Sequence, residues 1–275
     1  MGREIAFVAM AAGIGKRYGG RKQLQTFGSD KFTIAEYNVQ HAIEAGFEKF
    51  YFVVDGGIAE IFHRRLSDLL PSNCSLELIH QRSEEQLTKF YRREKPWGTA
   101  HAVMCCENAI GCNFCTTNAD DLYGRDAIFK IAEFLRSADG GSSVFANVAY
   151  GLSETLSSGG TVSRGIITAD GGFLKSIGET HGICSGSIGK NIPADAIVSM
   201  NLWGFTPEVF AMLRSCWKDF LKNVSALDVD EFGLPNFINS ALKNGKCSVR
   251  ILNTSSKWVG VTHKSDDGAV EDALR

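Results

Sequence analysis

The sequence contains no segment that could cross a bilayer and no strong excess of charge of either sign. No run approaches the roughly 18 apolar residues that a membrane-spanning helix needs. Residues 1–10 lack the basic region and long apolar stretch of a signal peptide. Lysine and arginine number 29 against 31 acidic residues, and neither half of the chain is strongly basic. These absences argue against a membrane protein, a secreted protein and a general nucleic-acid binder, so the expected compartment is the cytoplasm.

The sequence also lacks a complete set of zinc ligands, although it contains eight cysteines. Cys112 and Cys115 have the spacing of half a zinc site, but no second pair and no histidines at matching spacing accompany them. We therefore expect buried, reduced thiols in preference to a metal site or disulfides.

The composition is that of a soluble globular protein, with 44% hydrophobic and 22% charged residues in a chain of 275. Apolar runs predict strands at residues 5–10, 49–54 and 76–80, and helical spacing predicts helices at 34–45 and 58–70 between them. Thr33 and Glu36 match a capping box, and Gly46 is placed to end the first helix. This alternation predicts an α/β fold with a mostly parallel, doubly wound sheet.

The pattern continues to the end of the chain, so we expect one domain over residues 1–275. Helices are expected at 100–108, 126–136 and 207–222, and strands at 143–148, 197–205 and 246–252. Residues 151–190 are rich in glycine and serine, and within them two strand-like runs flank Asp170-Gly171-Gly172, which is typical of a hairpin. We expect this segment to be a small β-rich insertion at the edge of the sheet.

A glycine-rich loop follows the first strand. Its alanines and glycines let the backbone approach a ligand closely, so that several N–H groups can converge on phosphate oxygens. An arginine and a lysine then follow within reach of the same group. The candidate binding residues are Ala11, Ala12, Gly13, Gly15, Arg17 and Lys22. The loop has neither the G-x-G-x-x-G register nor the Gly-Lys-Ser/Thr ending of a Walker A loop, so a tight turn with surface cations is the alternative.

Two adjacent carboxylates, Asp120 and Asp121, end a strand that begins near Phe114. The carboxyl ends of strands are where open α/β sheets bind their ligands. Two neighbouring carboxylates repel each other unless a cation holds them, and Mg²⁺ prefers such hard oxygen ligands together with substrate phosphates. The alternative is an Asx turn that caps the next helix.

The segment from Ala11 to Leu24 resembles the A-A-G-x-G-x-R…K-Q signature of nucleotidyltransferases, which join a nucleoside triphosphate to a phosphorylated sugar or alcohol. Residues 96–103, 118–124 and 258–266 also resemble segments of these enzymes, so the likeness covers nearly the whole chain. It implies a Rossmann-like mixed sheet of the nucleotide-diphospho-sugar transferase type. It further implies transfer of a nucleoside monophosphate to a phosphorylated acceptor, with a sugar 1-phosphate as first candidate, release of pyrophosphate and Mg²⁺ as cofactor.

The resemblance also assigns roles to individual residues. Catalysis would depend on Arg17, Lys22 and Asp120, of which Asp120 would bind the metal. The loop would bind the nucleotide together with Gln81, Gly98 and Thr99. The acceptor would contact Asp121, Asn201, Glu231 and Lys264. Many of these enzymes have a second metal-binding aspartate where this chain has Gly260, so that ligand is in doubt, and Asp266 is the substitute candidate.

Structural alternatives accompany several of these roles. Thr99 is also placed to cap a helix, Asn201 to be a satisfied buried amide, and Glu231 to cap a helix at the surface. For Asp121 the alternative to orienting the acceptor is orienting a water molecule, and the C-terminal segment is equally consistent with a solvated polar terminus.

Two other functions stay open at this point. The first is a cytidylyltransferase of the CTP:phosphocholine type, whose aromatic cage would draw on Trp97, Tyr123, Trp203 and Trp258. The second is a non-catalytic nucleotide-binding regulator. The expected partners are a nucleoside triphosphate and a phosphorylated small molecule, with self-association possible and neither nucleic acid nor membrane involved. The base and the acceptor are open.

Overall fold

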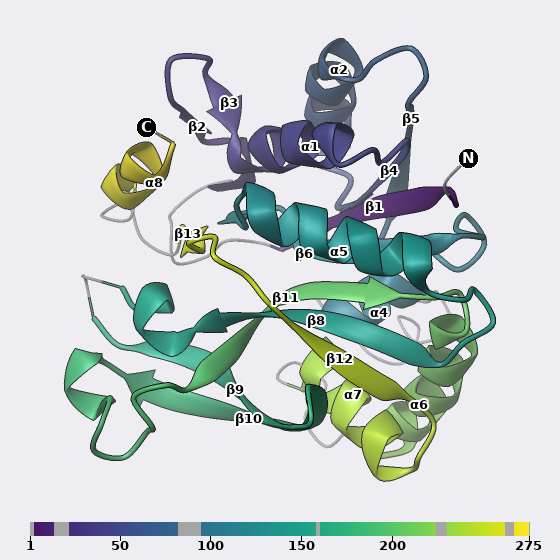
Figure 1. Ribbon diagram of the computed structural model, residues 1–275. Coiled ribbons are helices and arrows are strands. Elements are labelled where there is room, and N and C mark those ends of the chain that lie inside the picture. Colours follow the sequence, from purple (N-terminus) through teal and green to yellow (C-terminus); the bar gives the residue numbers. More distant parts are fainter. Residues whose placement is uncertain are drawn as a thin grey trace.

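The computed structural model describes residues 3–13, 22–81, 95–157, 160–223, 230–261 and 267–274, and of Lys22 the backbone alone. Its centre is one large mixed sheet (Figure 1). The strands of this sheet are β1 (Ile5–Met10), β4 (Lys49–Val54), β5 (Ser75–His80), β6 (Asn113–Asn118), β8 (Val144–Gly151), β9 (Val162–Asp170), β10 (Phe173–Ile183), β11 (Ile197–Phe205) and β12 (Ser248–Asn253). Their order is β5-β4-β1-β6-β11-β8-β12-β10-β9.

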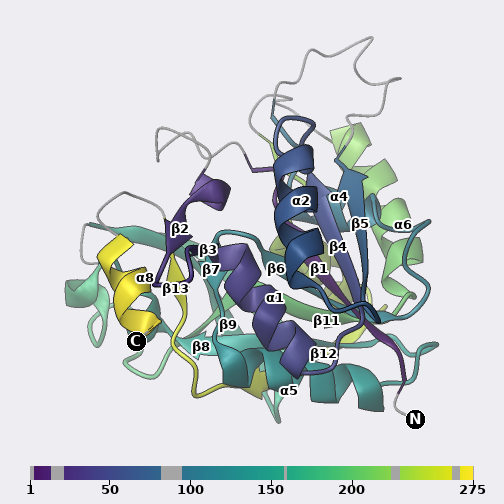
Figure 2. The ribbon, with the colours of Figure 1, turned by 90° about the horizontal axis from the view of Figure 1, so that it is seen from above.

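Helices cover both faces of the sheet, and short elements complete the fold (Figure 2). The helices are α1 (Ile34–Glu44), α2 (Ala59–Leu69), α4 (Thr99–Met104), α5 (Arg125–Ser137), α6 (Val209–Asn223), α7 (Leu234–Lys243) and α8 (Asp267–Ala273). The 3₁₀ turns are η1 (Lys22–Leu24), η2 (Leu152–Thr155) and η3 (Ser185–Ser187). Two short ladders pair β2 (Thr26–Phe27) with β3 (Phe32–Thr33), and β7 (Asp121–Leu122) with β13 (Val259–Gly260).

Strand β1 shows why the sequence reads as a continuous apolar run. Phe7 and Ala9 belong to a core cluster that includes residues of α1, α2 and α5, while Ala6 and Val8 belong to a second cluster with residues of α4, α6 and α7. Successive side chains of a strand point to opposite faces, so both sets must be apolar when both faces are covered. The mixed α/β architecture with a central sheet is therefore as expected.

The strands β5, β4, β1 and β6 are all parallel. Chain order runs outward from β1 to β4 and β5, then returns to the other side of β1 with β6. The direction of winding thus reverses between β1 and β6, and such switch points are where open α/β sheets bind ligands.

The other half of the sheet is mixed, and it corrects one expectation. Strand β11 is antiparallel to β6 and β8, and β8 is parallel to β12. The predicted hairpin, β9 and β10, is present but is not a simple edge insertion, because β9 also pairs with β11 through Val198–Ile166 and Ser199–Gly165. The pairings among β11, β8, β12, β10 and β9 therefore close a ring. Strand β11 can pair with both β8 and β9 because Asn201 has φ +64° and the register shifts between Ser199 and Trp203.

Local sequence signals were mostly reliable. Thr33 and Glu36 form the capping box at α1, and Gly46, with φ +79°, follows its end. Helix α4 stops at Met104 rather than 108, because the following turns are closed by bonds three residues apart, such as Cys106 N–H to Val103 O. Among the described helices, none is long and apolar enough to span a bilayer.

The cysteines are free thiols, but only two of the eight are buried as expected. Cys106 and Cys115 are buried, most of the others are partly covered, and Cys184 is exposed. The described residues contain no group of three or more side chains arranged to ligate a metal through histidine, cysteine or carboxylate, at Cys112 and Cys115 or elsewhere.

Candidate functional site

The glycine-rich loop and the paired carboxylates start from neighbouring points of the sheet. Met10 and Asn118, the last residues of β1 and β6, face each other in the parallel register. The N–H of Ala119 then donates to the carbonyl of Met10 across 3.1 Å. The loop that begins at Ala11 and the carboxylate of Asp120 therefore leave the sheet side by side, at the switch point.

Both ends of the loop are held by hydrogen bonds. Ala11 is buried and its N–H donates to Val53 O over 2.7 Å, so the backbone donors available to a ligand begin at Ala12. At Gly13, the carbonyl accepts a hydrogen bond from Nε2 of the buried Gln23 side chain. Gln23 was missed as a site residue, although it belongs to the K-Q part of the signature. Gly15, Arg17 and the side chain of Lys22 lie outside the described residues.

A cleft of about 350 Å³ opens at this point of the sheet. It brings together six of the predicted residues: Gly13, Gln81, Gly98, Thr99, Asp120 and Glu231. Glu231, expected on the acceptor side, thus shares its cleft with the residues expected to bind the nucleotide. Lys95 lines the same cleft and was missed, although it directly precedes the P-W-G-T segment.

Gln81 is fixed in one orientation at the edge of the cleft. Its N–H extends the sheet by donating to Val54 O (3.1 Å), and its Nε2 donates to Gly98 O (3.0 Å). The same Nε2 lies 3.3 Å from Nδ1 of the buried His101. Because a carbonyl only accepts hydrogen bonds, the nitrogen of the amide must face Gly98. The Oε1 atom of Gln81 is left as the acceptor for a ligand.

Gly98 permits a close contact between α4 and the segment that carries Glu231. It has φ +105°, and a Cβ there would lie 2.7 Å from the carbonyl oxygen of Phe232. The backbone of Phe232 forms hydrogen bonds with residues on both sides of Gly98. Its N–H donates to Trp97 O (2.6 Å), and its carbonyl accepts the N–H of Ala100 (3.0 Å). A residue with a side chain would push these backbones apart.

Thr99 corrects a second expectation, because it does not cap α4. Gly98 occupies the cap position, where no side-chain hydrogen bond is made. The Oγ1 of Thr99 instead accepts the N–H of Leu234, at the start of α7, across 2.9 Å. The predicted nucleotide residue therefore joins two helices at the rim of the cleft.

The two carboxylates have different surroundings. Asp120 is half-buried and lines the cleft. Asp121 is only 8% exposed, and its Oδ2 accepts a hydrogen bond from Nδ2 of Asn118 (2.8 Å) while its backbone carbonyl accepts one from Asn38 (2.7 Å). Asp121 is not among the residues that line the cleft, so the structure does not bring it together with Asp120 as a second ligand-facing carboxylate.

Position 260 has no room for a side chain. Gly260 pairs with Asp121 in the β7–β13 ladder. A Cβ on Gly260 would lie 2.4 Å from the ring of Trp258 and 2.6 Å from Oδ1 of Asp121. The departure from the expected aspartate is therefore built into the packing. The other C-terminal candidates, Lys264 and Asp266, lie outside the described residues.

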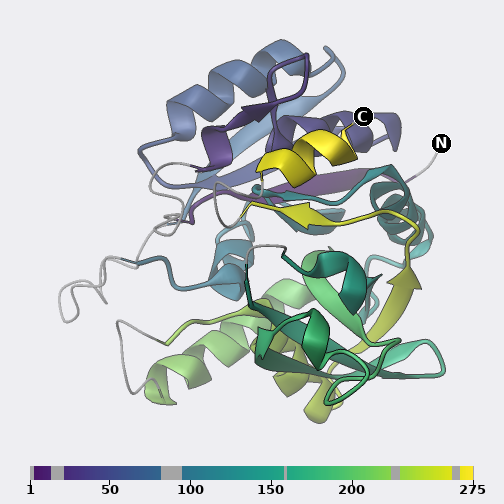
Figure 3. The same ribbon diagram turned by 90° about the vertical axis from the view of Figure 1, so that its left-hand side faces the viewer.

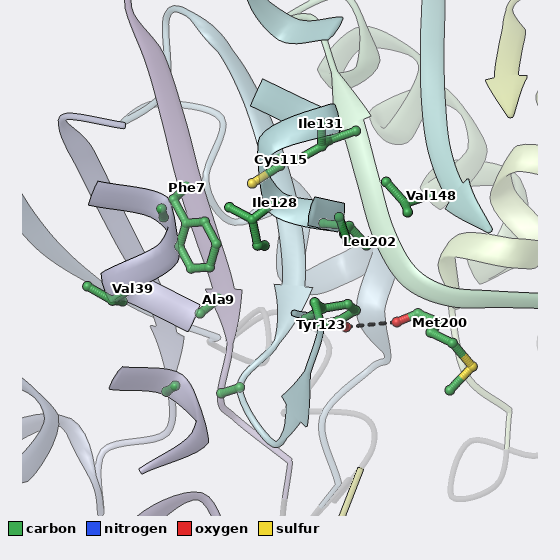
Figure 4. Packing of buried hydrophobic residues seen from close by; sticks show 14 of the residues in the cluster. Phe7, Ala9, Val39, Cys115, Tyr123, Ile128, Ile131, Val148, Met200 and Leu202 are labelled. Atoms are coloured by element: carbon green, nitrogen blue, oxygen red, sulfur yellow. Dashed lines mark hydrogen bonds between the residues drawn. The ribbon is translucent and has the colours of Figure 1, made fainter. Parts of the chain in front are cut away.

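Tyr123 connects the end of β6, two residues before Asp120, to β11, the strand that carries Asn201. Its hydroxyl donates to Met200 O (2.7 Å; Figure 4) and accepts the N–H of Asn118 (2.9 Å). Complete burial raises the pKa of Tyr123 well above its ordinary value, and the neighbouring Asp121 adds to this, so the phenol remains a donor at neutral pH. Sequence reasoning had no signal for this role.

Asn201 itself is only partly explained by the sequence. Its Oδ1 accepts a hydrogen bond from Nε1 of Trp203 over 3.3 Å, and its backbone has positive φ. It does not line the cleft. The oxygen of the Asn201 amide therefore has a hydrogen-bond partner within the protein, as the structural alternative predicted.

The aromatic residues considered for a cage do not form one. Trp97, Tyr123, Trp203 and Trp258 are each at most 8% exposed. Trp97 and Trp203 belong to the core cluster on one face of the sheet, whereas Tyr123 and Trp258 belong to the cluster on the other. These four side chains therefore cannot surround one quaternary ammonium group.

The fold is shared with solved nucleotidyltransferases. The structure of the inositol-1-phosphate CTP transferase from T. maritima matches 100% of this chain and 96% of its own, with a TM-score of 0.66 and 14% identity. The UDP-glucose pyrophosphorylase from Acinetobacter baumanii matches 98% and 92%, with a TM-score of 0.65 and 14% identity. A putative glucose-1-phosphate thymidylyltransferase from Bacillus anthracis matches 98% and 95%, with a TM-score of 0.67 and 13% identity.

No protein-family model matches the chain. No curated protein matches it in sequence. At these low identities the structural matches confirm the resemblance at the level of the fold, over the full length of the chain.

Proposed function

We propose that this protein is a nucleotidyltransferase. It transfers a nucleoside monophosphate from a nucleoside triphosphate to a phosphorylated acceptor, with a sugar 1-phosphate as first candidate, and releases pyrophosphate. The observation that carries the proposal is the meeting of Gly13, at the start of the glycine-rich loop, with Gln81, Gly98 and Asp120 in one cleft at the switch point of the sheet. The enzymes with the same fold act on CTP with inositol 1-phosphate and on UDP-glucose, by their names, which supports this reaction class and a Rossmann-like sheet of their type.

The reaction is attack by an acceptor phosphate oxygen on the α-phosphorus, which forms one P–O bond while the bond to pyrophosphate breaks. A phosphate monoester oxygen is already anionic near pH 7, so the chain need not supply a general base. Such transfers depend on alignment and on neutralisation of charge. In the proposal, Arg17 and the N–H groups from Ala12 onward hold the β- and γ-phosphates, and Lys22 lies at the α-phosphate where charge develops.

The other cleft residues would bind the nucleoside. Gln81 presents its Oε1 as an acceptor for N–H groups on the edge of the base, because its Nε2 is already engaged by Gly98. The backbone of Gly98 and the start of α4 would pack against the base and ribose. Of the residues proposed from the sequence to contact the acceptor, Glu231 lines this cleft, Asp121 and Asn201 do not, and Lys264 lies outside the described residues. A cytoplasmic location and self-association stay predictions from the sequence.

The donor set at the cleft suits Mg²⁺. This ion typically takes one or two protein carboxylates and completes its shell with water and substrate phosphates. Asp120 offers a half-buried carboxylate there, whereas Asp121 is engaged by Asn118 and position 260 has no side chain. Asp120 would therefore hold the ion, with Asp266 as the proposed second ligand. When bound, Mg²⁺ would supply neutralisation of the charge on the triphosphate.

A pyrophosphate-release screen tests the proposal. The four common nucleoside triphosphates are combined with a panel of sugar 1-phosphates and with phosphocholine, in the presence of Mg²⁺. At least one sugar 1-phosphate is expected to give turnover. Binding of nucleotide with no release for any combination would refute the proposed reaction and favour the non-catalytic regulator.

Asp120→Asn tests the role of the carboxylate. Loss of one electrostatic contact to the transition state typically lowers kcat by about 100- to 1,000-fold, and we expect that loss here with unchanged thermal unfolding. The matched control is Asp195→Asn, an exposed carboxylate outside the cleft, which should retain activity. Wild-type turnover in Asp120→Asn would remove this residue from the catalytic group.

A further inference from the structure

A second and larger cavity, of about 660 Å³, lies beside the β7–β13 ladder. Its walls come from η2 and the start of β9 on one side and from β13 and α8 on the other. Figure 3 shows the yellow α8 and, below it, the yellow strand, both above the green β9–β10 hairpin. The volume lies in the range of small-molecule sites, about 300–1,000 Å³. Gly260 in its wall pairs with Asp121, whose neighbour Asp120 lines the nucleotide cleft.

Arg164 is held rigidly in the wall of this cavity. Its Nε donates to Oγ1 of Thr155 (3.2 Å), its Nη2 donates to Thr155 O, and its Nη1 donates to Ser163 O (2.9 Å). The guanidinium also lies over the ring of Trp258, 4.9 Å from its centre. These contacts fix the plane of the guanidinium and leave one N–H on each terminal nitrogen for a ligand.

Arg164 shares this cavity with three carboxylates, Glu154, Glu179 and Asp272, but forms no ion pair with them. Within the described ranges, no carboxylate lies at ion-pair distance from it. Burial lowers the pKa of Arg164, and the more distant Asp121 opposes that effect. A partly buried cation is costly unless an anion accompanies it, and an arginine stays protonated rather than giving up its charge. The wall of the cavity is therefore of mixed charge, and the guanidinium of Arg164 is the cation there that hydrogen bonds to Thr155 and Ser163 hold in one plane.

We propose that Arg164 binds an oxyanion of the acceptor, which occupies this cavity. The inference rests on the proposed function, because it places the second substrate of that reaction on the far side of Asp120 and Asp121 from the nucleotide. The planar fork of arginine matches the oxygens of a phosphate or a carboxylate. The oxyanion is either the reacting phosphate or a further anionic group on the acceptor. Arg164 orients the acceptor and exchanges no proton with it.

Steady-state kinetics of Arg164→Gln test this assignment. We expect the KM for the acceptor to rise by about 10- to 100-fold, as for loss of a charged hydrogen bond, while the KM for the nucleotide stays unchanged. Arg164→Lys, which keeps the charge without the fork, should recover part of the loss. Arg250→Gln is the matched control, because Arg250 also lies over an aromatic ring, that of Phe173, but away from the cavity. An acceptor KM within twofold of wild type in Arg164→Gln would overturn the inference.

The acceptor panel distinguishes the two sources of the oxyanion. An equal loss for all sugar 1-phosphates identifies the reacting phosphate as the group that Arg164 binds. A loss confined to acceptors with a second anionic group, such as uronic acid 1-phosphates, identifies that group instead. Both results support an oxyanion contact.

A binding measurement without nucleotide separates this inference from the proposed function. Inorganic phosphate is the probe, and broadening of its ³¹P resonance reports binding. Loss of broadening in Arg164→Gln but not in Arg250→Gln supports the oxyanion contact even if no substrate pair releases pyrophosphate, in which case only the proposed function fails. Unchanged broadening in Arg164→Gln overturns the inference, even with turnover intact.

A purely structural role for Arg164 makes a different prediction. Thr155→Val removes the hydroxyl that accepts from Nε but leaves the guanidinium in place. If Arg164 only fastens η2 to β9, the loss of phosphate broadening in each variant should follow its loss of thermal stability, which would overturn the inference. We expect Thr155→Val to lower thermal stability and to retain most of the phosphate binding.

Discussion

Replacement of Gly98 by alanine should damage both stability and nucleotide binding, for reasons that the structure makes quantitative. Gly98 has φ +105° and ψ 178°, a conformation essentially reserved for glycine, and forcing another residue into it costs about 1–3 kcal/mol. The new Cβ would also lie 2.7, 2.9 and 3.1 Å from the oxygen, carbon and nitrogen of Phe232. These are backbone atoms, so they cannot rotate away, and we expect a total loss of about 2–4 kcal/mol.

The same clash predicts a functional effect. Relief requires the Phe232 backbone to move away from α4, and Glu231 and the start of α7 would move with it. Because Glu231 and Gly98 line one cleft, the KM for the nucleotide should rise by about tenfold, the factor that 1.4 kcal/mol of lost binding corresponds to.

Gly245→Ala is the matched control for this prediction. Gly245 also has positive φ, +63°, but no atom lies within 4 Å of the position its Cβ would take. It should lose only the conformational cost of about 1–2 kcal/mol, with normal nucleotide KM. Urea unfolding gives the free energies, and pyrophosphate release gives the KM values. If Gly98→Ala is no less stable than Gly245→Ala, the close contact with the Phe232 backbone is not the reason that position 98 requires glycine.

Three further substitutions or modifications test other parts of the site. Tyr123→Phe leaves the partly buried N–H of Asn118 without its acceptor, so the free energy of unfolding should fall by about 1–3 kcal/mol. The kcat should fall by a larger factor than that by which the KM of either substrate rises. An unchanged urea midpoint would contradict this prediction. Gly260→Ala places a methyl group 2.4 Å from the Trp258 ring and should lower the urea midpoint; a stable variant would show that the β13 segment can yield. The hydrogen bond with Ser187 lowers the pKa of Cys184, so at pH 8 iodoacetamide should modify this thiol faster in the folded protein than in the urea-unfolded chain. This difference in rate should vanish above about pH 9, where the thiol is a thiolate in both states. Mass spectrometry of the peptide measures the labelling, and slower labelling in the folded state would refute the prediction.

The parts of the fold that sequence predicted are those governed by local patterns. The apolar runs of β1, β4 and β5 are continuous because both faces of that part of the sheet are covered. The Asp170-Gly171-Gly172 turn fixed the hairpin for an equally local reason. The proximity of the loop to Asp120 was also predictable, because carboxyl ends of neighbouring parallel strands emerge together.

The parts that sequence missed depend on contacts between distant segments. Nothing in the residues around Thr99 indicates that its hydroxyl serves the start of α7 rather than its own helix. The return of β9 to β11 depends on a left-handed residue inside a strand, at Asn201, which strand periodicity does not reveal. Arg164 is on β9 and Trp258 directly precedes β13, so their stacking joins segments far apart in the sequence and had no local signal.

The glycine at position 260 follows from the arrangement of the two carboxylates beside it. Two adjacent aspartates repel when both face one cleft, and here one faces the cleft while the other turns toward β13. Oδ1 of Asp121, together with the ring of Trp258, then fills the space that a side chain at 260 would need. With Trp258 and Asp121 in these positions, a side chain at 260 requires one of them to move, which disfavours the expected second aspartate. The glycine at 260 thus accompanies an arrangement in which Asp120 faces the cleft while Asp121 is held by Asn118.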